Sequence, residues 1–357
     1  MKKNILFLSF MAVSLWVSCG KKVTPVDPVI PTTDVTLQTA SSIKIGCAID
    51  PNLLKNNALY KGVVIKEYNS VTAENAMKWG ALHQSQTTFN FVDADYIADF
   101  CTANNKRLFG HTLLWHAYNP SWLENFSGDS TAFENLMKTH IQTVVGRYKG
   151  KAVAWDVVNE AFDDNGNMRT ESIWFKKLGK DYIARAFKYA AEADPTAILI
   201  YNDYGQEYSS NKLQSIIAMV KDFKTRGIPI HGLGLQMHIS IASSDNGILN
   251  ALSEYANTGL KVHISELDIN LTNGVKNASL TFTDALAEQQ KQKFKTVAKY
   301  YKQIVPVAQQ FGITTWNVGD ADSWIRSVIQ KNEYPLLFDD NYNKKPAYTG
   351  FVEGLKF

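Results

Sequence analysis

The sequence has no run of basic residues, although Lys and Arg number 37 against 34 Asp and Glu and the formal net charge is +3. Proteins that bind nucleic acid usually gather Lys and Arg into a patch, because contacts with phosphates supply most of the affinity. The even mixture of charges therefore makes nucleic acid a poor candidate for the partner.

The sequence also lacks a run of about 20 apolar residues, the length that a membrane-spanning helix needs. A shorter apolar stretch, residues 5–17, follows Lys2 and Lys3 and is closed by Ser18-Cys19. A basic start, a short apolar stretch and a closing cysteine are typical of a bacterial lipoprotein signal peptide. We therefore expect removal of residues 1–18, lipidation of Cys19, and export to the periplasm or cell surface, with membrane contact only through this anchor. The alternative is that Cys19 merely ends an ordinary signal peptide.

Cysteine is scarce, since only Cys47 and Cys101 accompany Cys19. Export would permit a disulfide between these two, but nothing in the sequence places them together. Buried free thiols are therefore the expected state.

Residues 19–42 are rich in Pro, Val and Thr and follow neither a helical nor a strand period. Such a segment is expected to stay extended and solvated, as a tether between membrane and domain would. No second linker and no internal repeat follow. Residues 43–357 are therefore expected to form one domain, which we expect to be a monomer.

Short apolar or β-branched segments alternate along this domain with longer segments of helical spacing. The predicted strands are residues 43–49, 68–72, 107–115, 152–159, 197–204, 232–239, 261–269 and 312–318. The helical segments between them include 91–104, 132–148, 180–193, 212–226 and 288–311. This alternation predicts an α/β fold, a single closed (β/α)8 TIM barrel. An open doubly wound sheet would carry a glycine-rich turn after its first strand, where this chain has Asp50-Pro51-Asn52.

Polar side chains stand at or just beyond the carboxyl ends of predicted strands two to eight. In a barrel these ends meet on the face that carries the active site. One such residue is usually a helix cap or a loop contact, but a series on successive strands is hard to explain by capping. The series consists of Glu74, His111, Glu160, Asp203, His238, Glu266 and Trp316.

Two of these residues, Glu160 and Glu266, suit glycosidic bond cleavage. Glu160 ends an apolar strand, and shielding from water favours the protonated form that a general acid needs. Glu266 lies on the seventh strand, so a barrel places it across the mouth from Glu160. Carboxyl groups about 5–5.5 Å apart suit a retaining double displacement, whereas about 6.5–9.5 Å leaves room for the water of an inverting reaction. The sequence leaves this separation open.

Neighbouring residues offer support to the two glutamates. His238 can donate to Glu266 while Asp268 sets its tautomer. The alternative for His238 is a core histidine bonded to a backbone carbonyl. Asn159, next to Glu160, can reach the 2-hydroxyl of a sugar, a contact that strengthens in the transition state of glycoside hydrolysis.

These segments resemble glycoside hydrolase family 10, the endo-β-1,4-xylanases. The resemblance covers about residues 43–356 in the order of the family. It rests on TAENAMKW at 72–79, GHTLLWH at 110–116, WDVVNEA at 155–161, NDY at 202–204, QMH at 236–238, ISELDI at 264–269, the Trp316…Trp324 segment and residues 335–348.

The resemblance implies a role for each matching position. Glu160 is similar to the acid/base of the family, and Glu266 is similar to its nucleophile. Glu74, Asn75 and Lys78 resemble the group that binds the sugar two units from the cut on the non-reducing side. Tyr204 resembles the aromatic residue that meets the leaving-side sugar. The lining around the reacting sugar is matched by His111, Trp115, Asn159, Gln236, His238, Trp316 and Trp324.

Three positions depart from the family pattern. Tyr118 stands where glutamine is common, and we expect it near the non-reducing-side subsites, where its ring either excludes glucose units or points into solvent. Gly205 stands where asparagine is usual, which puts one leaving-side contact in doubt. Asn317 stands where glycine is common.

The sequence therefore predicts an endo-β-1,4-xylanase that acts on xylan or xylo-oligosaccharides without a cofactor. One alternative is a β-1,4-glucanase or mixed β-glycanase on the same fold. A non-catalytic glycan-binding lipoprotein is a second, but both catalytic carboxylates are present. A metal hydrolase is a third, and no metal is expected, because His111 and His116 are five residues apart along an extended strand and face opposite sides.

Overall fold

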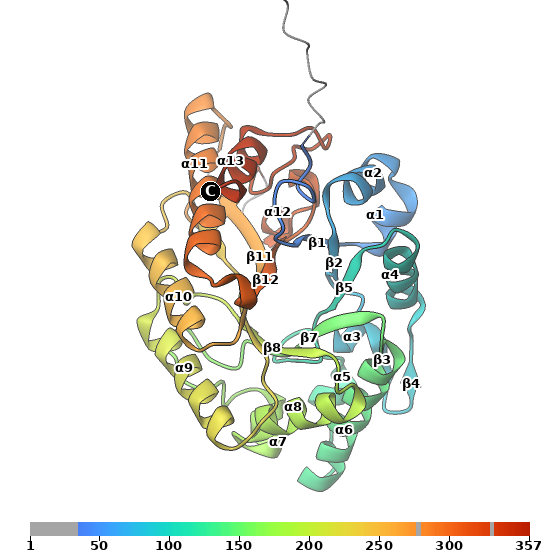
Figure 1. Cartoon of the computed structure of the whole chain (residues 1–357). Coiled ribbons are helices and arrows are strands. Elements are labelled where there is room, and N and C mark those ends of the chain that lie inside the picture. The colour runs from blue at the N-terminus through green and yellow to red at the C-terminus, as the bar shows by residue number, and fades with distance from the viewer. Residues whose placement is uncertain (1–34, 276–279, 329–331) are drawn as a thin grey trace, which may run out of the picture. The chain divides into compact units, whose positions relative to one another are not determined.

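Eight parallel strands form a closed ring in the computed structural model (Figure 1). Each strand pairs with the next in chain order, and the ring closes where the last pairs with the first; at Gly46, for example, β1 faces Ser70 of β2 on one side and Thr314 of β12 on the other. The predicted (β/α)8 barrel is confirmed. Its strands are β1 (Ile45–Ile49), β2 (Ser70–Ala73), β5 (Arg107–Gly110), β7 (Ala152–Asn159), β8 (Ile198–Asp203), β9 (Gly232–Leu235), β11 (Lys261–Asn270) and β12 (Gln310–Thr315).

The structure describes residues 35–275, 280–328 and 332–357. The predicted signal peptide, Cys19 and most of the predicted linker lie outside them. The barrel unit begins at Thr36. Leu37 is fully buried, and its backbone N–H donates to Glu67 Oε2 at 3.0 Å. The packed part of the chain thus starts earlier than the predicted boundary between residues 42 and 43. Within the described ranges, no helix is both long and apolar enough to cross a membrane.

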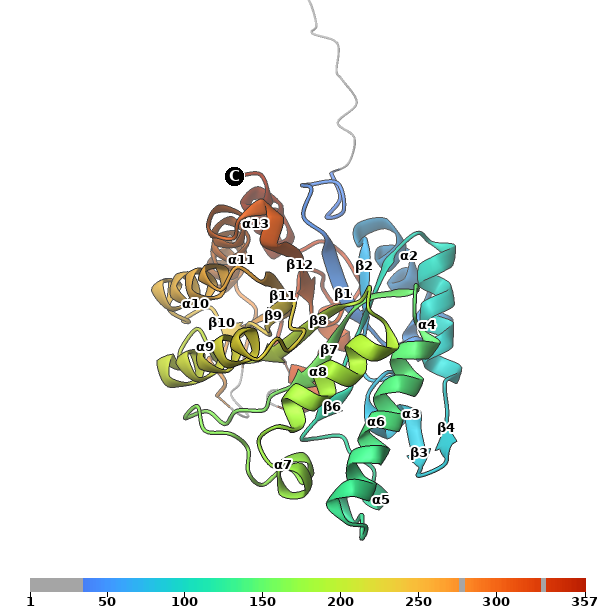
Figure 2. The same ribbon diagram turned by 60° about the horizontal axis from the view of Figure 1, so that its bottom comes forward.

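Helices surround the ring of strands (Figures 1 and 2). Helix α8, for example, buries Ile183, Ala186, Phe187 and Ala190, which recur at helical spacing. The helices are α1 (Pro51–Asn56), α2 (Ala58–Glu67), α3 (Trp79–Leu82), α4 (Val92–Ala103), α5 (Ser121–Glu124), α6 (Ser130–Arg147), α7 (Ile173–Leu178), α8 (Tyr182–Ala193), α9 (Ser210–Thr225), α10 (Asp245–Asn257), α11 (Asp284–Ile304), α12 (Trp324–Val328) and α13 (Pro346–Leu355).

The helix predicted at residues 288–311 ends earlier in the structure than expected. Helix α11 ends at Ile304, where Val305 is extended and Pro306 follows. The residue before a proline is pushed away from helical geometry, and proline has no N–H to continue the hydrogen-bond ladder. The residues from Gln310 onward therefore belong to β12 instead of the helix.

Two predicted strands are interrupted near the mouth of the barrel. Predicted strand 107–115 consists of β5 and the short β6 (Leu114–Trp115), which pairs with the end of β7. Predicted strand 232–239 consists of β9 and β10 (His238–Ser240), separated by Met237 at a φ of 63°. In a continuous strand, successive side chains point to opposite faces. The side chains at these breaks are not bound by that alternation.

A small antiparallel hairpin, β3 (His83–Ser85) and β4 (Thr88–Phe89), lies beside α3 (Figure 2). Here two buried histidines, His83 and His140, bring their Nδ1 atoms within 3.3 Å of each other. Both rings stack on Trp79, with centroid separations of 5.3 and 3.6 Å. Burial lowers the pKa of His83 to about 4 and that of His140 well below its usual range, so both rings are neutral at pH 7.

Cys47 and Cys101 are both free and buried, as expected from the sequence. Burial raises the pKa of the Cys101 thiol to about 12 and moves that of Cys47 in the same direction. Both thiols are therefore protonated and inert in the native state.

Candidate active site

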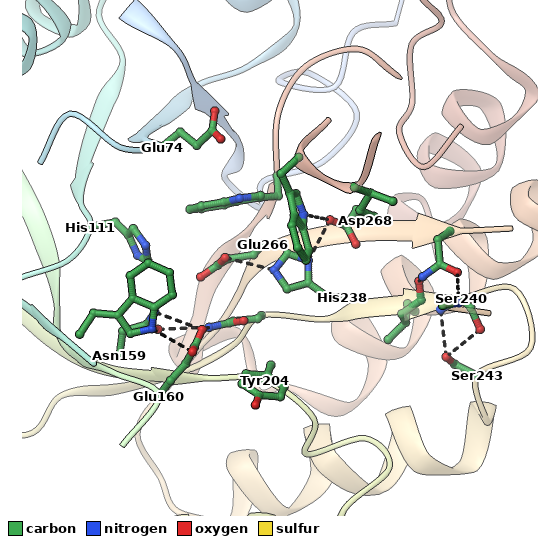
Figure 3. Close-up of a pocket in the computed structure, with 18 of the residues that line it drawn as sticks. Glu74, His111, Asn159, Glu160, Tyr204, His238, Ser240, Ser243, Glu266 and Asp268 are labelled. Carbon is green, nitrogen blue, oxygen red and sulfur yellow. Dashed lines mark hydrogen bonds and ion pairs between the residues drawn. The ribbon is translucent and has the colours of Figure 1, made fainter. Parts of the chain in front are cut away.

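A cavity of about 710 Å³ opens at the carboxyl ends of the barrel strands, within the usual size range of small-molecule sites. Figure 3 shows Glu74 at one end, Ser240 and Ser243 at another, and the carboxylates of Glu160 and Glu266 between them. The structure brings together every predicted catalytic, binding and supporting residue except Tyr118. The lining residues among them are Glu74, Asn75, Lys78, His111, Trp115, Asn159, Glu160, Tyr204, Gln236, His238, Glu266, Asp268, Trp316 and Trp324.

Glu160 directly follows β7 and has a φ of 55°. This left-handed conformation is uncommon outside glycine and ends the strand at the point where the side chain enters the cavity. Its Oε2 accepts a hydrogen bond from Trp115 Nε1 at 2.8 Å, and its Oε1 accepts one from Gln236 Nε2 at 2.8 Å. His116 Nδ1 lies 3.7 Å from Oε2. Both carboxyl oxygens are thus held in fixed directions.

Glu266 lies within β11, on the opposite part of the ring, and is 5% exposed. Its Oε1 accepts a hydrogen bond from Asn202 Nδ2 at 2.7 Å. Its Oε2 lies 3.2 Å from His238 Nε2. The amide on one oxygen and the imidazole on the other fix the plane of this carboxyl group.

An amide chain connects the two glutamates. Asn202 Nδ2 donates to Glu266 Oε1 and also to Asn159 Oδ1, at 2.7 and 3.0 Å. Gln236 Nε2 donates to the same Asn159 oxygen at 3.2 Å and to Glu160 Oε1 at 2.8 Å. Amides from three different strand ends therefore couple the positions of the two carboxyl groups, so that neither can turn alone.

His238 bridges Glu266 and Asp268. Its Nδ1 lies 2.8 Å from Asp268 Oδ2, which also accepts a hydrogen bond from Trp324 Nε1 at 2.9 Å. Burial by itself would lower the pKa of His238, but the carboxylates of Asp268 and Glu266 outweigh it and raise that pKa to about 10. The ring is therefore charged at neutral pH and donates an N–H to each carboxylate. The alternative of a core histidine bonded to a backbone carbonyl is wrong.

His111 pairs with Asp156, its Nδ1 lying 2.8 Å from Asp156 Oδ2, and both are buried. Burial lowers the pKa of His111, and Lys78 adds to this effect. Burial likewise raises the pKa of Asp156, reinforced by Glu266. Both shifts favour an uncharged pair, so His111 can exchange hydrogen bonds with a ligand without bringing a charge into the cavity.

At one end of the cavity, Lys78 is the hub of a polar group. Its Nζ donates to Asn75 Oδ1 at 2.9 Å and lies 4.8 Å from the centre of the Trp115 ring. Burial lowers the pKa of Lys78, an effect opposed by the nearby glutamates, and burial also raises the pKa of Glu74. Fixed donors and acceptors beside an aromatic face suit a sugar, whose hydroxyls need partners and whose ring faces are apolar.

Tyr118 stands apart from the other predicted residues. It is 52% exposed and is not part of the cavity lining. Lys78 Nζ lies 5.7 Å from the centre of its ring. The ring covers Gly80, where a Cβ atom would lie 2.6 Å from the Tyr118 carbonyl oxygen and 3.1 Å from the ring. Tyr118 therefore occupies the rim of the cavity, next to Lys78.

The other two departures from the family pattern share a backbone conformation. Gly205 has a φ of 84° and Asn317 a φ of 86°. Glycine adopts this region freely, and asparagine is among the few other residues that tolerate it. Asn317 also gains a contact that glycine lacks, because its Nδ2 donates to Glu74 Oε2 at 2.7 Å.

Sequence reasoning missed several residues that hold the site. Asp156 and Asn202 lie within apolar strands, where a polar residue signals an inward position, but their partners could not be read from the sequence. Asp203 was noted at a strand end, but its buried ion pair with Lys212, at 2.8 Å, was not foreseen. Lys212 Nζ in turn lies 3.5 Å from the centre of the Tyr204 ring, beneath this cavity residue.

No group of three or more His, Cys, Asp or Glu side chains is arranged to hold a metal ion in the part of the chain that the structure describes.

Comparison with known proteins places this geometry in a family. The model of glycosyl hydrolase family 10 matches residues 35–354. The endo-beta-1,4-xylanase Xyn10C of Cellvibrio japonicus is 40% identical over 325 residues, which make up 85% of this chain and 54% of that protein. The exoglucanase XynX of Acetivibrio thermocellus is 37% identical over 87% of this chain and 28% of its own length. The chain thus spans about half or less of these two relatives.

Solved structures agree in fold. A variant of xylanase 10C from Cellvibrio japonicus, in complex with xylopentaose, superposes with a TM-score of 0.86 at 37% identity, covering 90% of this chain and 69% of that one. The match extends over the whole barrel and not over a single motif. The chain belongs to glycosyl hydrolase family 10.

Proposed function

We propose that this chain is an endo-β-1,4-xylanase, which hydrolyses internal bonds of xylan or xylo-oligosaccharides by a retaining double displacement. The observation that carries the proposal is the pair Glu160 and Glu266, held in one cavity by a shared amide chain. The xylanase names of relatives and the xylopentaose bound to a structural neighbour support the choice of substrate.

In this mechanism Glu266 is the nucleophile. The charged His238 donates to its Oε2. The nucleophile attacks as a carboxylate, and this carboxylate forms again when the covalent intermediate is hydrolysed. Asn202 holds Oε1, which fixes the direction of approach to the sugar carbon.

Glu160 is the acid/base. It protonates the glycosidic oxygen as the first bond breaks, and it then takes a proton from the water that attacks the glycosyl-enzyme. Trp115 and Gln236 orient its two oxygens. The neighbouring Asn159 supports this geometry and presents its amide toward the 2-hydroxyl of the reacting sugar.

The remaining lining residues bind the sugars on either side of the cut. Glu74, Asn75 and Lys78 hold hydroxyls on the non-reducing side, while Tyr204 faces the first sugar on the leaving side. Asp268 supports His238. The other sugar contacts are assigned to His111, Trp115, Gln236, His238, Trp316 and Trp324.

Azide rescue tests the two assignments. Glu266→Ala should lower kcat by more than about 10⁴-fold on every substrate, because no nucleophile remains. Glu160→Ala should still form the glycosyl-enzyme from dinitrophenyl xylobioside, whose leaving group needs no proton, and azide should then restore turnover and yield the azide of retained configuration. Glu74→Ala, which removes a carboxylate from the same cavity, is the matched control and should show no rescue. A retained azide product from the Glu266 variant instead of the Glu160 variant would reverse the assignment.

Substrate class is tested by comparing wild-type activity on linear xylan and on carboxymethylcellulose. Faster hydrolysis of xylan, with products of several lengths appearing early, is the expected result. If the enzyme prefers carboxymethylcellulose, it is a β-1,4-glucanase on the same barrel. One relative is named an exoglucanase, which supports testing this alternative. The anomeric form of the first product, followed by NMR, separately tests retention.

For location, we propose an exported lipoprotein anchored through Cys19, acting as a monomer at the periplasmic face or the cell surface. The support is the sequence around Ser18-Cys19. The full chain should partition with membranes and carry lipid at Cys19, and Cys19→Ala should prevent lipidation. Mass spectrometry that finds an unmodified mature N-terminus at another residue would contradict the anchor.

A further inference from the structure

An exposed aromatic residue, Tyr208, lines the cavity that holds the two glutamates. It is 64% exposed. An aromatic ring open to solvent on the wall of a sugar-binding cavity is a ready stacking surface, because the C–H faces of a pyranose are apolar. The roles assigned above leave Tyr208 without a function.

The position of Tyr208 places it on the leaving-group side of the cut. Arg169 links Glu160 to Tyr204: its Nε donates to the Glu160 carbonyl oxygen at 3.1 Å, and one terminal nitrogen donates to the Tyr204 hydroxyl at 2.8 Å. Tyr204 thus stands beside the acid, and Figure 3 shows it across the carboxylate pair from Glu74. Tyr208 comes four residues later on the same loop, farther from β8.

The turn between these tyrosines fixes the direction of the Tyr208 ring. The backbone N–H of Tyr208 donates to the Gly205 carbonyl at 3.2 Å, and that of Ser209 donates to the same oxygen at 2.8 Å. Gly205 has no side chain, and a Cβ atom there would lie 3.1 Å from Tyr208 Cε2 and 3.4 Å from Cζ. The ring therefore lies against the glycine on one side, while much of its remaining surface stays open.

The loop that carries Tyr208 is held rigidly against its surroundings. Ser209 Oγ donates to the Asp164 carbonyl at 2.9 Å. On the other side, Gly247 of α10 approaches so closely that a Cβ atom would lie 2.0 Å from the Glu207 carbonyl oxygen. Ser240 and Ser243, which come just before α10, line the same cavity as Tyr208. A loop held in this way lowers the entropy that binding would cost.

We propose that Tyr208 is the stacking platform for the second sugar on the leaving side, beyond the one that meets Tyr204. It selects substrates with at least two sugar units after the cut. This inference rests on the proposed glycanase function and deepens it by naming a residue that sets the preferred chain length.

The test compares two substrates that differ only in what lies beyond the cut. Aryl xylobioside has no sugar on the leaving side, whereas xylopentaose can occupy both leaving-side positions. In Tyr208→Ala, the ratio of kcat/KM for xylopentaose to that for aryl xylobioside should fall roughly 5- to 20-fold, through loss of one stacking contact. End-labelled xylopentaose should also be cut closer to its reducing end, because the second leaving-side position no longer attracts a sugar.

Two variants serve as controls. Tyr208→Phe keeps the ring and should keep the wild-type ratio. Phe357→Ala removes an aromatic ring of similar exposure, 53%, at the carboxyl terminus and should leave the ratio unchanged. An unchanged ratio in Tyr208→Ala would overturn the proposal. An equal loss on both substrates would overturn it as well, since Tyr208 would then support the catalytic groups instead of a distant sugar.

Failure of the proposed xylanase function would give a different result. Wild-type enzyme would then cleave neither xylopentaose nor aryl xylobioside. If it cleaves cello-oligosaccharides instead, the same ratio measured with cellopentaose and aryl cellobioside decides the role of Tyr208 by the same criteria.

Discussion

Asp268→Asn removes the negative charge that keeps His238 protonated. In the structure, Asp268 Oδ2 receives hydrogen bonds from His238 and Trp324, while Oδ1 has no partner among the described residues. The amide of asparagine has the same shape as the carboxylate, and its oxygen can take the place of Oδ2. The substitution therefore changes charge with little change in packing.

The expected size of the effect follows from the titration of His238. A rise of its pKa from 6.5 to about 10 corresponds to a preference for the charged ring on the order of 5 kcal/mol. Asp268 is the larger of the two carboxylate contributions, so the pKa should fall markedly in the variant. Replacing a charged donor to Glu266 by a neutral one should cost about 1–2 kcal/mol, or roughly 5- to 30-fold in kcat/KM at pH 7.

The pH dependence has a defined direction. His238 supports Glu266 while it is protonated, so its contribution is present below its pKa and is lost as pH rises through it. In the wild type that loss lies near pH 10. Dinitrophenyl xylobioside needs no proton from Glu160, so its alkaline limb of kcat/KM reports on His238 and should move to lower pH in Asp268→Asn. The contribution of this pair to stability has the same sign: it is fully present below pH 6.5 and is lost as pH rises toward 10.

The test combines NMR titration of His238 with pH profiles for the hydrolysis of dinitrophenyl xylobioside. The melting temperature of the variant should be recorded at pH 6, so that unfolding is not mistaken for loss of charge. If His238 of the wild type titrates near or below its ordinary value of 6.5, the proposed charged donor does not exist and the reasoning is refuted.

Three further predictions concern other parts of the molecule. Lys212→Met should lower the free energy of unfolding by about 3–5 kcal/mol, because it leaves the buried Asp203 carboxylate without its cationic partner. The double variant Lys212→Met/Asp203→Asn should regain part of that stability in thermal denaturation, and equal stability of the single and double variants would contradict the prediction. Because of the buried histidines His83 and His140, the free energy of unfolding should fall by about 1–3 kcal/mol between pH 6.5 and 4, since the unfolded chain binds protons that the folded rings do not. Denaturant titrations should show a smaller loss in His83→Gln, and a stability that does not change with pH in the wild type would refute the prediction. Tyr118→Ala should raise kcat/KM on aryl cellobioside relative to aryl xylobioside by about 10-fold, because removal of the ring from the rim leaves room for the hydroxymethyl group of glucose. An unchanged ratio would mean that Tyr118 does not set specificity.

The order of strands and helices could be predicted from the sequence because it depends on short-range patterns. Apolar runs bounded by helical spacing recur eight times, and the structure keeps that order around the ring. Once a closed barrel is inferred, the polar residues at the strand ends must meet at its mouth. Glu160 and Glu266 could therefore be assigned to one cavity before their contacts were known.

The sequence was less informative where a segment departs from regular geometry. The breaks after β5 and β9 and the end of α11 at Ile304 depend on local backbone choices that apolar patterns do not encode. Pro306 was a visible signal for the last of these, and the long helical period before it concealed the boundary.

The amino-acid pattern was enough to predict the barrel, the pair Glu160 and Glu266 and their place on one face. The partners of each carboxylate became clear only in the folded structure. The Asn202 link between the glutamates, the charge on His238, the rim position of Tyr118 and the exposed ring of Tyr208 all arise from groups on different strands or loops. Contacts of this kind depend on register, side-chain direction and shielding from water, which no stretch of sequence contains by itself.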